Sequence, residues 1–72
     1  MNNFVEKAFA ERLKELRTEK SLSTVALGKI LNVSNSTICR WENGQADIKS
    51  NELIKVARFF QVSADYLIGL ED

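Results

Sequence analysis

Only two residues separate the second and third helical segments of this chain. The earlier segment ends at Leu31, and Ser34 is suited to cap the next helix. Because Asn32 and Val33 alone lie between them, we expect a sharp turn with one residue at positive φ, which Asn adopts best among non-glycine residues. Gly28 is unfavourable inside a helix by about 1 kcal/mol relative to Ala. We therefore expect Gly28 to let the next helix cross closely.

Periodicity and serine caps predict five helical segments, no strands and an all-α fold. Apolar residues recur at helical steps from Phe4 to about Lys20, at Val5, Phe9, Leu13 and Leu16. Serines suited to N-caps precede the other four segments, namely Ser23 (helix through Leu31), Ser34 (to about Asn43), Ser50 and Ser63. The expected apolar contacts are Leu27, Ile30 and Leu31 of the second segment and Leu53, Val56, Ala57 and Phe60 of the fourth. The short fifth segment contains Tyr66, Leu67 and Ile68. Gly44 suits the left-handed position after the third helix.

Length and composition exclude several classes of protein. A chain of 72 residues makes one small domain, 1–72, and a single cysteine excludes an internal disulfide. No apolar run approaches the roughly 20 residues of a membrane span. The start, "MNNFVEKAFAERL", lacks a long apolar centre and a cleavage site, so we expect a cytoplasmic protein. With no histidine, no metal-ligand cluster, no phosphate-binding glycine loop and no nucleophile-base pair, we expect no enzyme, metal or cofactor.

Helical phase divides the third segment, within "VSNSTICRWENG", into two faces. At about 100° per residue, Ile38, Trp41 and Glu42 share an inward face. The outward face carries Ser36, Cys39, Arg40 and Asn43. These side chains are mostly short and polar, whereas a solubilising face more often carries long Glu and Lys. They suit a helix that enters the DNA major groove, which is about 12 Å wide, although a plain solvated face remains the alternative.

Nearly the whole sequence resembles the lambda-repressor and Cro-like (XRE-type) helix-turn-helix family. The resemblance runs from "RLKELRTEKSLS" through "LGKILNVSNSTICRWENG" to "ELIKVARFFQVSADYLIGL". It includes a small residue at Gly28 and apolar residues at Leu27, Leu31, Val33, Ile38 and Trp41. Asn32 departs from the usual glycine. The resemblance implies a compact five-helix DNA-binding domain whose helix-turn-helix, about residues 23–43, is formed by the second and third helices.

The resemblance also implies roles for individual residues. Arg40 is the strongest candidate for a base contact, because guanidinium binds guanine O6 and N7 bidentately. The candidate base-contacting residues are Asn35, Ser36, Cys39 and Arg40. Cys39 could instead be a small helix filler or a redox sensor.

Candidate contacts to the DNA backbone are Ser23, Thr24, Lys29, Ser34, Thr37, Asn43 and Lys49. Thr24 stands where many relatives carry glutamine, which puts a base contact there in doubt. In relatives the glutamate of "WENG" pairs with an arginine of the first helix, which implies a structural ion pair between Arg17 and Glu42. The alternative is two surface charges, but Glu42 lies on the core side, where an unpaired carboxylate is costly.

Two functions of different class follow. The first is a sequence-specific transcriptional regulator, a repressor that binds a two-fold operator in double-stranded DNA as a homodimer. The second is a protein-interaction module on the same fold, an antitoxin-like or anti-regulator partner of another protein. The ten basic and ten acidic residues cancel, which favours the second. Salt dependence separates the two, because phosphate neutralisation makes DNA affinity fall steeply with salt.

The C-terminal end is the candidate dimer interface. Phe59 lies away from the centre of the apolar face of its helix, where the core has little use for it. The expected interface residues are Phe59, Tyr66, Ile68 and Leu70. The alternative is that they close the base of the core against the first helix, where Phe4 and Val5 also need cover.

Overall fold

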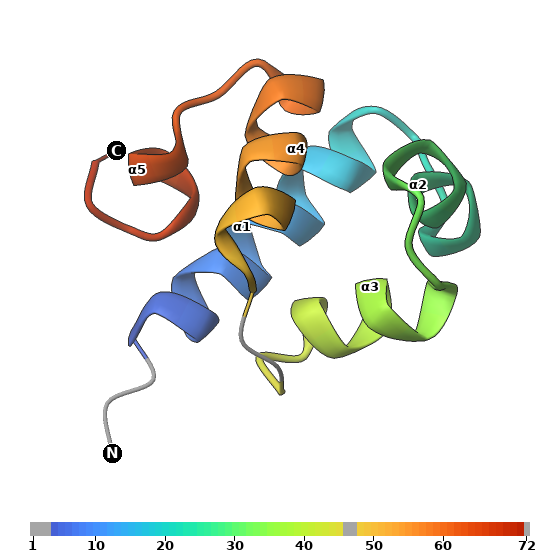
Figure 1. Cartoon of the computed structure of the whole chain (residues 1–72), viewed down its shortest axis with the longest axis horizontal. Helices are drawn as coiled ribbons and strands as arrows, with labels where there is room; N and C mark the ends of the chain where they lie inside the picture. The colour runs from blue at the N-terminus through green and yellow to red at the C-terminus, as the bar shows by residue number, and fades with distance from the viewer. Residues whose placement is uncertain (1–3, 46–47, 72) are drawn as a thin grey trace.

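The fold is all-α, as the sequence predicted. The computed structural model describes residues 4–45 and 48–71; residues 1–3, 46–47 and 72 of the predicted domain 1–72 lie outside this part. Within it the chain forms five helices and no strand (Figure 1). They are α1 (Phe4–Glu19), α2 (Thr24–Leu31), α3 (Asn35–Glu42), α4 (Ser50–Phe60) and α5 (Ala64–Leu67).

Three of the four predicted serine caps are confirmed. Each serine is extended, and its hydroxyl oxygen accepts a hydrogen bond from the backbone N–H three residues later, at 3.0 Å in every case. The three caps are Ser23 on α2, Ser34 on α3 and Ser63 on α5. Because such a hydroxyl satisfies a donor that a helix start otherwise leaves unpaired, these starts are set by local sequence.

The predicted cap of α4 at Ser50 is wrong by one residue. Lys49 is the N-cap residue, with φ −79° and ψ 154°, and Ser50 is already helical. The Glu52 carboxylate reaches back and accepts a hydrogen bond from the Lys49 N–H at 3.4 Å. A first-turn carboxylate can thus satisfy the helix start in place of a serine hydroxyl.

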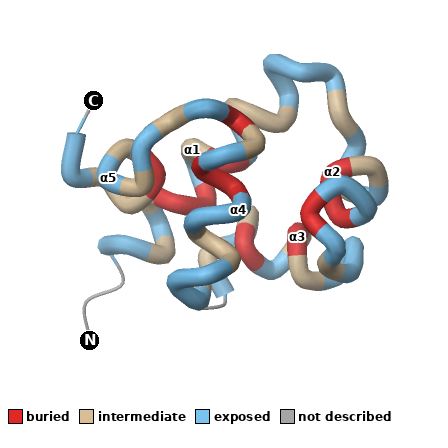
Figure 2. Tube along the Cα trace, turned by 45° about the horizontal axis from the view of Figure 1, so that its top comes forward, coloured by how far each residue is buried: buried red, intermediate tan, exposed pale blue. Residues whose placement is uncertain are grey.

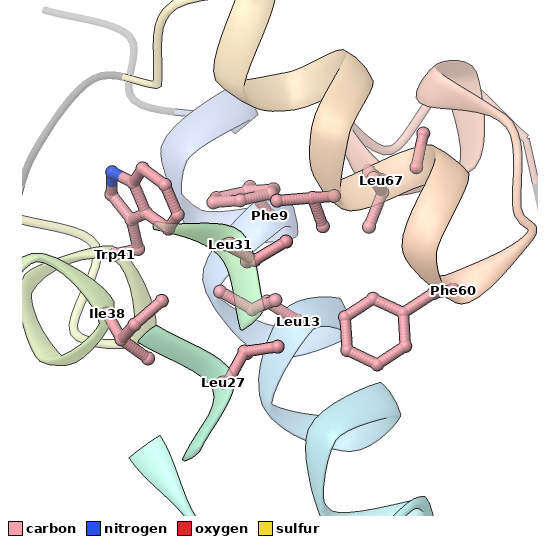
Figure 3. Packing of buried hydrophobic residues seen from close by; sticks show 10 residues of the cluster. Phe9, Leu13, Leu27, Leu31, Ile38, Trp41, Phe60 and Leu67 are labelled. Atoms are coloured by element: carbon pink, nitrogen blue, oxygen red, sulfur yellow. The ribbon is translucent and has the colours of Figure 1, made fainter. Parts of the chain in front are cut away.

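The core lies where the faces of all five helices meet (Figure 3). Its buried residues are Phe9 and Leu13 of α1, Leu27 and Leu31 of α2, Ile38 and Trp41 of α3, Val56, Ala57 and Phe60 of α4, and Leu67 of α5. The rings of Phe9 and Trp41 pack edge to face, with centroids 5.7 Å apart. This contact fixes α3 against α1 and explains why a mostly polar segment carries a tryptophan.

Two expected apolar contacts are wrong. Ile30 is 47% exposed and Val5 is 40% exposed. Leu31 is buried, and Ile30 precedes it by one residue, so its side chain lies about 100° round the helix from the buried side. In α1 the first buried side chain is Phe9, one turn after Val5.

The helices hold α3 from one side only. α3 contacts α1 and α2, whereas α5 contacts α1 and α4. Figure 2 shows buried stretches on the inner sides of the helices and exposed stretches facing outward. None of the helices in the described ranges has the length and apolarity that crossing a bilayer requires.

Candidate nucleic-acid interface

The turn between α2 and α3 has the geometry expected from its sequence. Asn32 adopts the left-handed conformation, with φ 61° and ψ 44°. The N–H of Val33 donates to the carbonyl oxygen of Gly28 at 2.9 Å, closing the turn. A Cβ on Gly28 would lie 2.8 Å from the carbonyl oxygen of Val33, closer than van der Waals contact allows. Gly28 therefore permits the close crossing of the two helices.

The start of α3 holds two hydroxyl groups that bind each other. The oxygens of Ser34 and Thr37 are 2.8 Å apart, and Ser34 also accepts the Thr37 N–H. One hydroxyl must donate to the other, so a single O–H remains to donate outward. The two predicted backbone contacts therefore offer one hydroxyl donor between them.

The outward face of α3 is exposed and polar. Asn35, Ser36, Arg40 and Asn43 are exposed, and Cys39 is a half-buried free thiol. The Cys39 sulfur lies 3.9 Å from Oδ1 of Asn35, a weak contact along the same face. In the part of the chain that the structure describes, the guanidinium of Arg40 makes no hydrogen bond or ion pair. The face therefore keeps the guanidinium of Arg40 and the side-chain amide of Asn43 available to a ligand.

The structure contains the ion pair between Arg17 and Glu42. Nε and Nη2 of Arg17 donate to the two carboxylate oxygens at 2.6 and 2.9 Å. Both side chains are largely buried, with 14% of Arg17 and 8% of Glu42 exposed. The hydrogen bonds to Glu42 hold the pKa of Arg17 above its usual range, against the opposing effect of burial. Nη1 donates to the carbonyl of Leu22 at 2.8 Å, so one guanidinium links α1, the loop before α2 and the end of α3.

The remaining predicted DNA contacts lie on α2 and just before α4. Ser23 is exposed at the start of α2, and Thr24, the first residue of that helix, is half-buried. Lys29 is exposed in the last turn of α2, and Lys49 is exposed before α4. The described residues contain no group of three His, Cys, Asp or Glu side chains that could hold a metal ion.

The four candidate interface residues at the C-terminal end differ in burial. Phe59 and Tyr66 pack partly against the core, and the Phe59 ring contacts Phe60 edge to face. The expectation that the core has little use for Phe59 is therefore wrong, because its ring packs partly against the core and contacts the ring of Phe60. Ile68 is half-buried, and Leu70 is 66% exposed.

Sequence reasoning assigned no role to Arg12, which holds this end of the chain. Its guanidinium lies 4.4 Å from the centre of the Tyr66 ring. Nη1 donates to the carbonyl oxygen of Tyr66 at 2.6 Å and also to that of Glu71. No local sequence signal indicates such a contact, because the paired residues are 54 and 59 positions apart.

A model of the helix-turn-helix family matches residues 13–67. The chain belongs to this family. The matched residues include the turn, the outward face of α3 and both members of the ion pair described above. The match supports the lambda-repressor and Cro-like (XRE-type) resemblance of the sequence.

Two relatives of this helix-turn-helix chain are named for opposite effects on transcription, one as an activator and one as a repressor. It is 36% identical over 64 residues to the HTH-type transcriptional activator BcrR of Enterococcus faecalis, covering 89% of this chain and 31% of that protein. It is 33% identical over 58 residues to repressor protein C2 of Salmonella phage P22, covering 81% of this chain and 27% of that protein. The chain thus spans less than a third of either relative.

Solved structures share the fold. The P22 c2 repressor protein in complex with synthetic operator 9T superposes with a TM-score of 0.81 at 30% identity, covering 88% of this chain and 96% of that chain. Hydroxypropylphosphonic acid epoxidase from S. wedmorenis gives a TM-score of 0.83 at 26% identity, covering 93% of this chain and 36% of that enzyme. The likeness to the enzyme therefore concerns one part of a longer protein.

Proposed function

We propose that this chain is the sequence-specific DNA-binding domain of a transcriptional repressor, and that α3 enters the major groove. The exposed polar face of α3 carries the proposal, with Arg40 unpaired among the described residues. An α-helix about 10–12 Å across fits the major groove. The P22 c2 repressor, similar in fold and sequence, was solved with a synthetic operator. Such a domain acts without enzymatic chemistry and meets its DNA in the cytoplasm.

Within this proposal, Arg40 discriminates bases and the capped helix starts contact phosphates. Arg40 lies in the last turn of α3, and the exposed Asn35 and Ser36 lie in its first turn. A bidentate contact from Arg to guanine contributes about 1–3 kcal/mol of base discrimination. Ser23, Thr24, Lys29, the Ser34–Thr37 pair, Asn43 and Lys49 would set register on the duplex without contributing sequence preference.

Selection of bound sequences from random duplex DNA tests the proposal. The wild type should enrich a defined sequence, and Arg40→Ala should lose selectivity while its circular dichroism spectrum stays native. Lys55→Ala, which removes an exposed cation of α4, is the matched control and should keep the wild-type sequence. If Arg40→Ala enriches the same sequence as the wild type, Arg40 is not part of base recognition.

The rival function, a protein-interaction module, is favoured by the zero net charge. The affinity of the wild type for its selected duplex should fall steeply with salt, since counterions are released from each neutralised phosphate. Failure to enrich any sequence, together with salt-insensitive binding to another protein, would favour the rival.

We propose further that two copies associate through the C-terminal end, so that two recognition helices can enter successive major grooves. The strongly exposed Leu70 and the half-buried Ile68 and Tyr66 support this surface, although Tyr66 also packs within its own chain. Ile68→Glu with Leu70→Glu should give a folded monomer with weaker operator affinity. Sedimentation that shows a wild-type monomer at micromolar concentration, free and on DNA, would defeat the dimer.

A further inference from the structure

Six of the eight charged residues of α1 lie in two neighbouring rows, and Glu6 and Arg12 belong to neither. Lys7, Lys14 and Arg17 follow one another at intervals of seven and three residues, which places them along one side of the helix. A second row at four-residue steps is acidic and consists of Glu11, Glu15 and Glu19. The sequence alone presented these residues as one mixed surface. The position of these charges relative to α3 decides which of them can lie near bound DNA.

Two members of the basic row, Lys7 and Arg17, adjoin the C-terminal end of α3. An open hollow of about 330 Å³ lies between the two helices, lined by Lys7, Ala10 and Glu11 of α1 and by Glu42, Asn43 and Gly44 at the end of α3. Further along the same side of α1, Arg17 binds Glu42. The exposed Asn43, a proposed phosphate contact, thus shares the hollow with Lys7.

Neither lysine of this row has an acidic partner among the residues that the structure describes. Lys7 and Lys14 are exposed, and their ammonium groups form no hydrogen bond or ion pair with any residue in 4–45 or 48–71. The charge of Arg17, by contrast, is neutralised by its ion pair with Glu42. The row therefore places one positive charge without a described partner at the end of α3, on Lys7, and a second on the same side of α1, on Lys14, in a chain whose net charge is zero.

We propose that Lys7 and Lys14 bind phosphates of the DNA backbone that borders the groove occupied by α3. The inference rests on the proposed DNA-binding function. A helix about 10–12 Å across fills a groove about 12 Å wide, so the phosphate strands lie just beyond its sides and ends. A cation on the helix packed against the end of α3 is well placed to meet one of them. These contacts would extend the DNA-binding surface to α1 and add affinity without base preference.

Salt titration of binding to the selected duplex tests this inference. Lys7→Met and Lys14→Met should each make the slope of log affinity against log salt shallower by about 0.9, one phosphate contact, and leave the selected sequence unchanged. Lys55→Met, on the exposed side of α4, is the matched control and should keep the wild-type slope. Glu11→Gln should tighten binding, because it removes a carboxylate that lines the hollow beside Lys7.

The outcomes separate this inference from the function on which it rests. If the wild type binds selectively but both lysine variants keep its salt slope, the inference is overturned and the DNA-binding function stands. If the wild type shows no salt-dependent DNA binding, both are overturned. A changed sequence preference in Lys7→Met would also contradict a pure phosphate contact.

Discussion

The turn between α2 and α3 and the C-terminal end are both tightly closed, but by contacts of different range. Residues close in sequence close the turn: the N–H of Val33 donates a hydrogen bond to the carbonyl oxygen of Gly28, and Ser34 caps α3. The second depends on α1, because Arg12 holds the carbonyls of Tyr66 and Glu71 from 54 and 59 residues away. The turn is therefore closed locally, although Arg17 and Phe9 of α1 also hold α3, whereas the proposed dimer surface depends on a distant side chain. We expect the two to open independently.

The largest effect should come from filling the space at Gly28. Gly28→Val would drive a side chain into the backbone of Val33, where even a Cβ would come within 2.8 Å of the carbonyl oxygen. We expect the free energy of unfolding to fall by about 3 kcal/mol or more, measured by urea denaturation followed through Trp41 fluorescence. A Cβ at Gly44 would lie 3.9 Å from the carbonyl oxygen of Glu6, an ordinary contact, but φ is 69°, so Gly44→Ala should cost only about 1–2 kcal/mol. Equal losses would show that the crossing at Gly28 is not close.

The next effect tests a long-range contact between α1 and the end of α3. Arg17→Ala leaves the largely buried Glu42 carboxylate without its guanidinium, and Glu42→Ala does the converse. Each should lower the free energy of unfolding by about 2 kcal/mol. In a double-mutant cycle the pair should show a coupling of about 1–3 kcal/mol. Losses that simply add would mean that the pair contributes nothing jointly to holding α3.

Removal of Arg12 should have a smaller effect, confined to the C-terminal end. Arg12→Met should cost about 1 kcal/mol, because it removes hydrogen bonds to two carbonyls and the ring contact with Tyr66. The amides of Gly69 and Leu70 should exchange faster with solvent, while those of α3 keep the wild-type rate. Lys55→Met is the control, since it removes an exposed cation elsewhere. Faster exchange throughout α3 would mean that the two regions open together.

The smallest effect compares two helix ends with the same backbone and different side chains. Asn32 after α2 has φ 61° and ψ 44°, and Gln61 after α4 has φ 57° and ψ 44°. Asn tolerates this conformation better than Gln does. Gln61→Gly should therefore raise the free energy of unfolding by about 0.5 kcal/mol, and Asn32→Gly should change it less. A larger gain at Asn32, measured by thermal unfolding, would reverse this order.

Sequence reasoning succeeded where neighbours determine the structure. Ser23, Ser34 and Ser63 cap their helices, and Asn32 adopts positive φ, because each depends on residues a few positions away. Helical phase correctly placed Ile38 and Trp41 inside and Arg40 outside. The contact between Arg17 and Glu42 was expected from the family resemblance together with phase.

The sequence was less informative where the result depends on which helices meet. Ile30 and Phe59 were misplaced because periodicity does not show how far a neighbouring helix covers the side of an apolar face. The roles of Arg12 and Lys7 depend on contacts across the fold, with the C-terminal end and with the end of α3. Residue type and spacing carry no information on either.

The thiol of Cys39 gives this chain a chemical handle. It is the only cysteine of the sequence, free, half-buried and on the outward face of α3. A maleimide dye or nitroxide would therefore attach at one known position without engineering. Because that position faces the proposed DNA surface, a bound duplex should shield the thiol from alkylation, whereas a partner at the C-terminal end should leave its rate unchanged. A single labelling reaction can thus distinguish which end of the molecule is occupied.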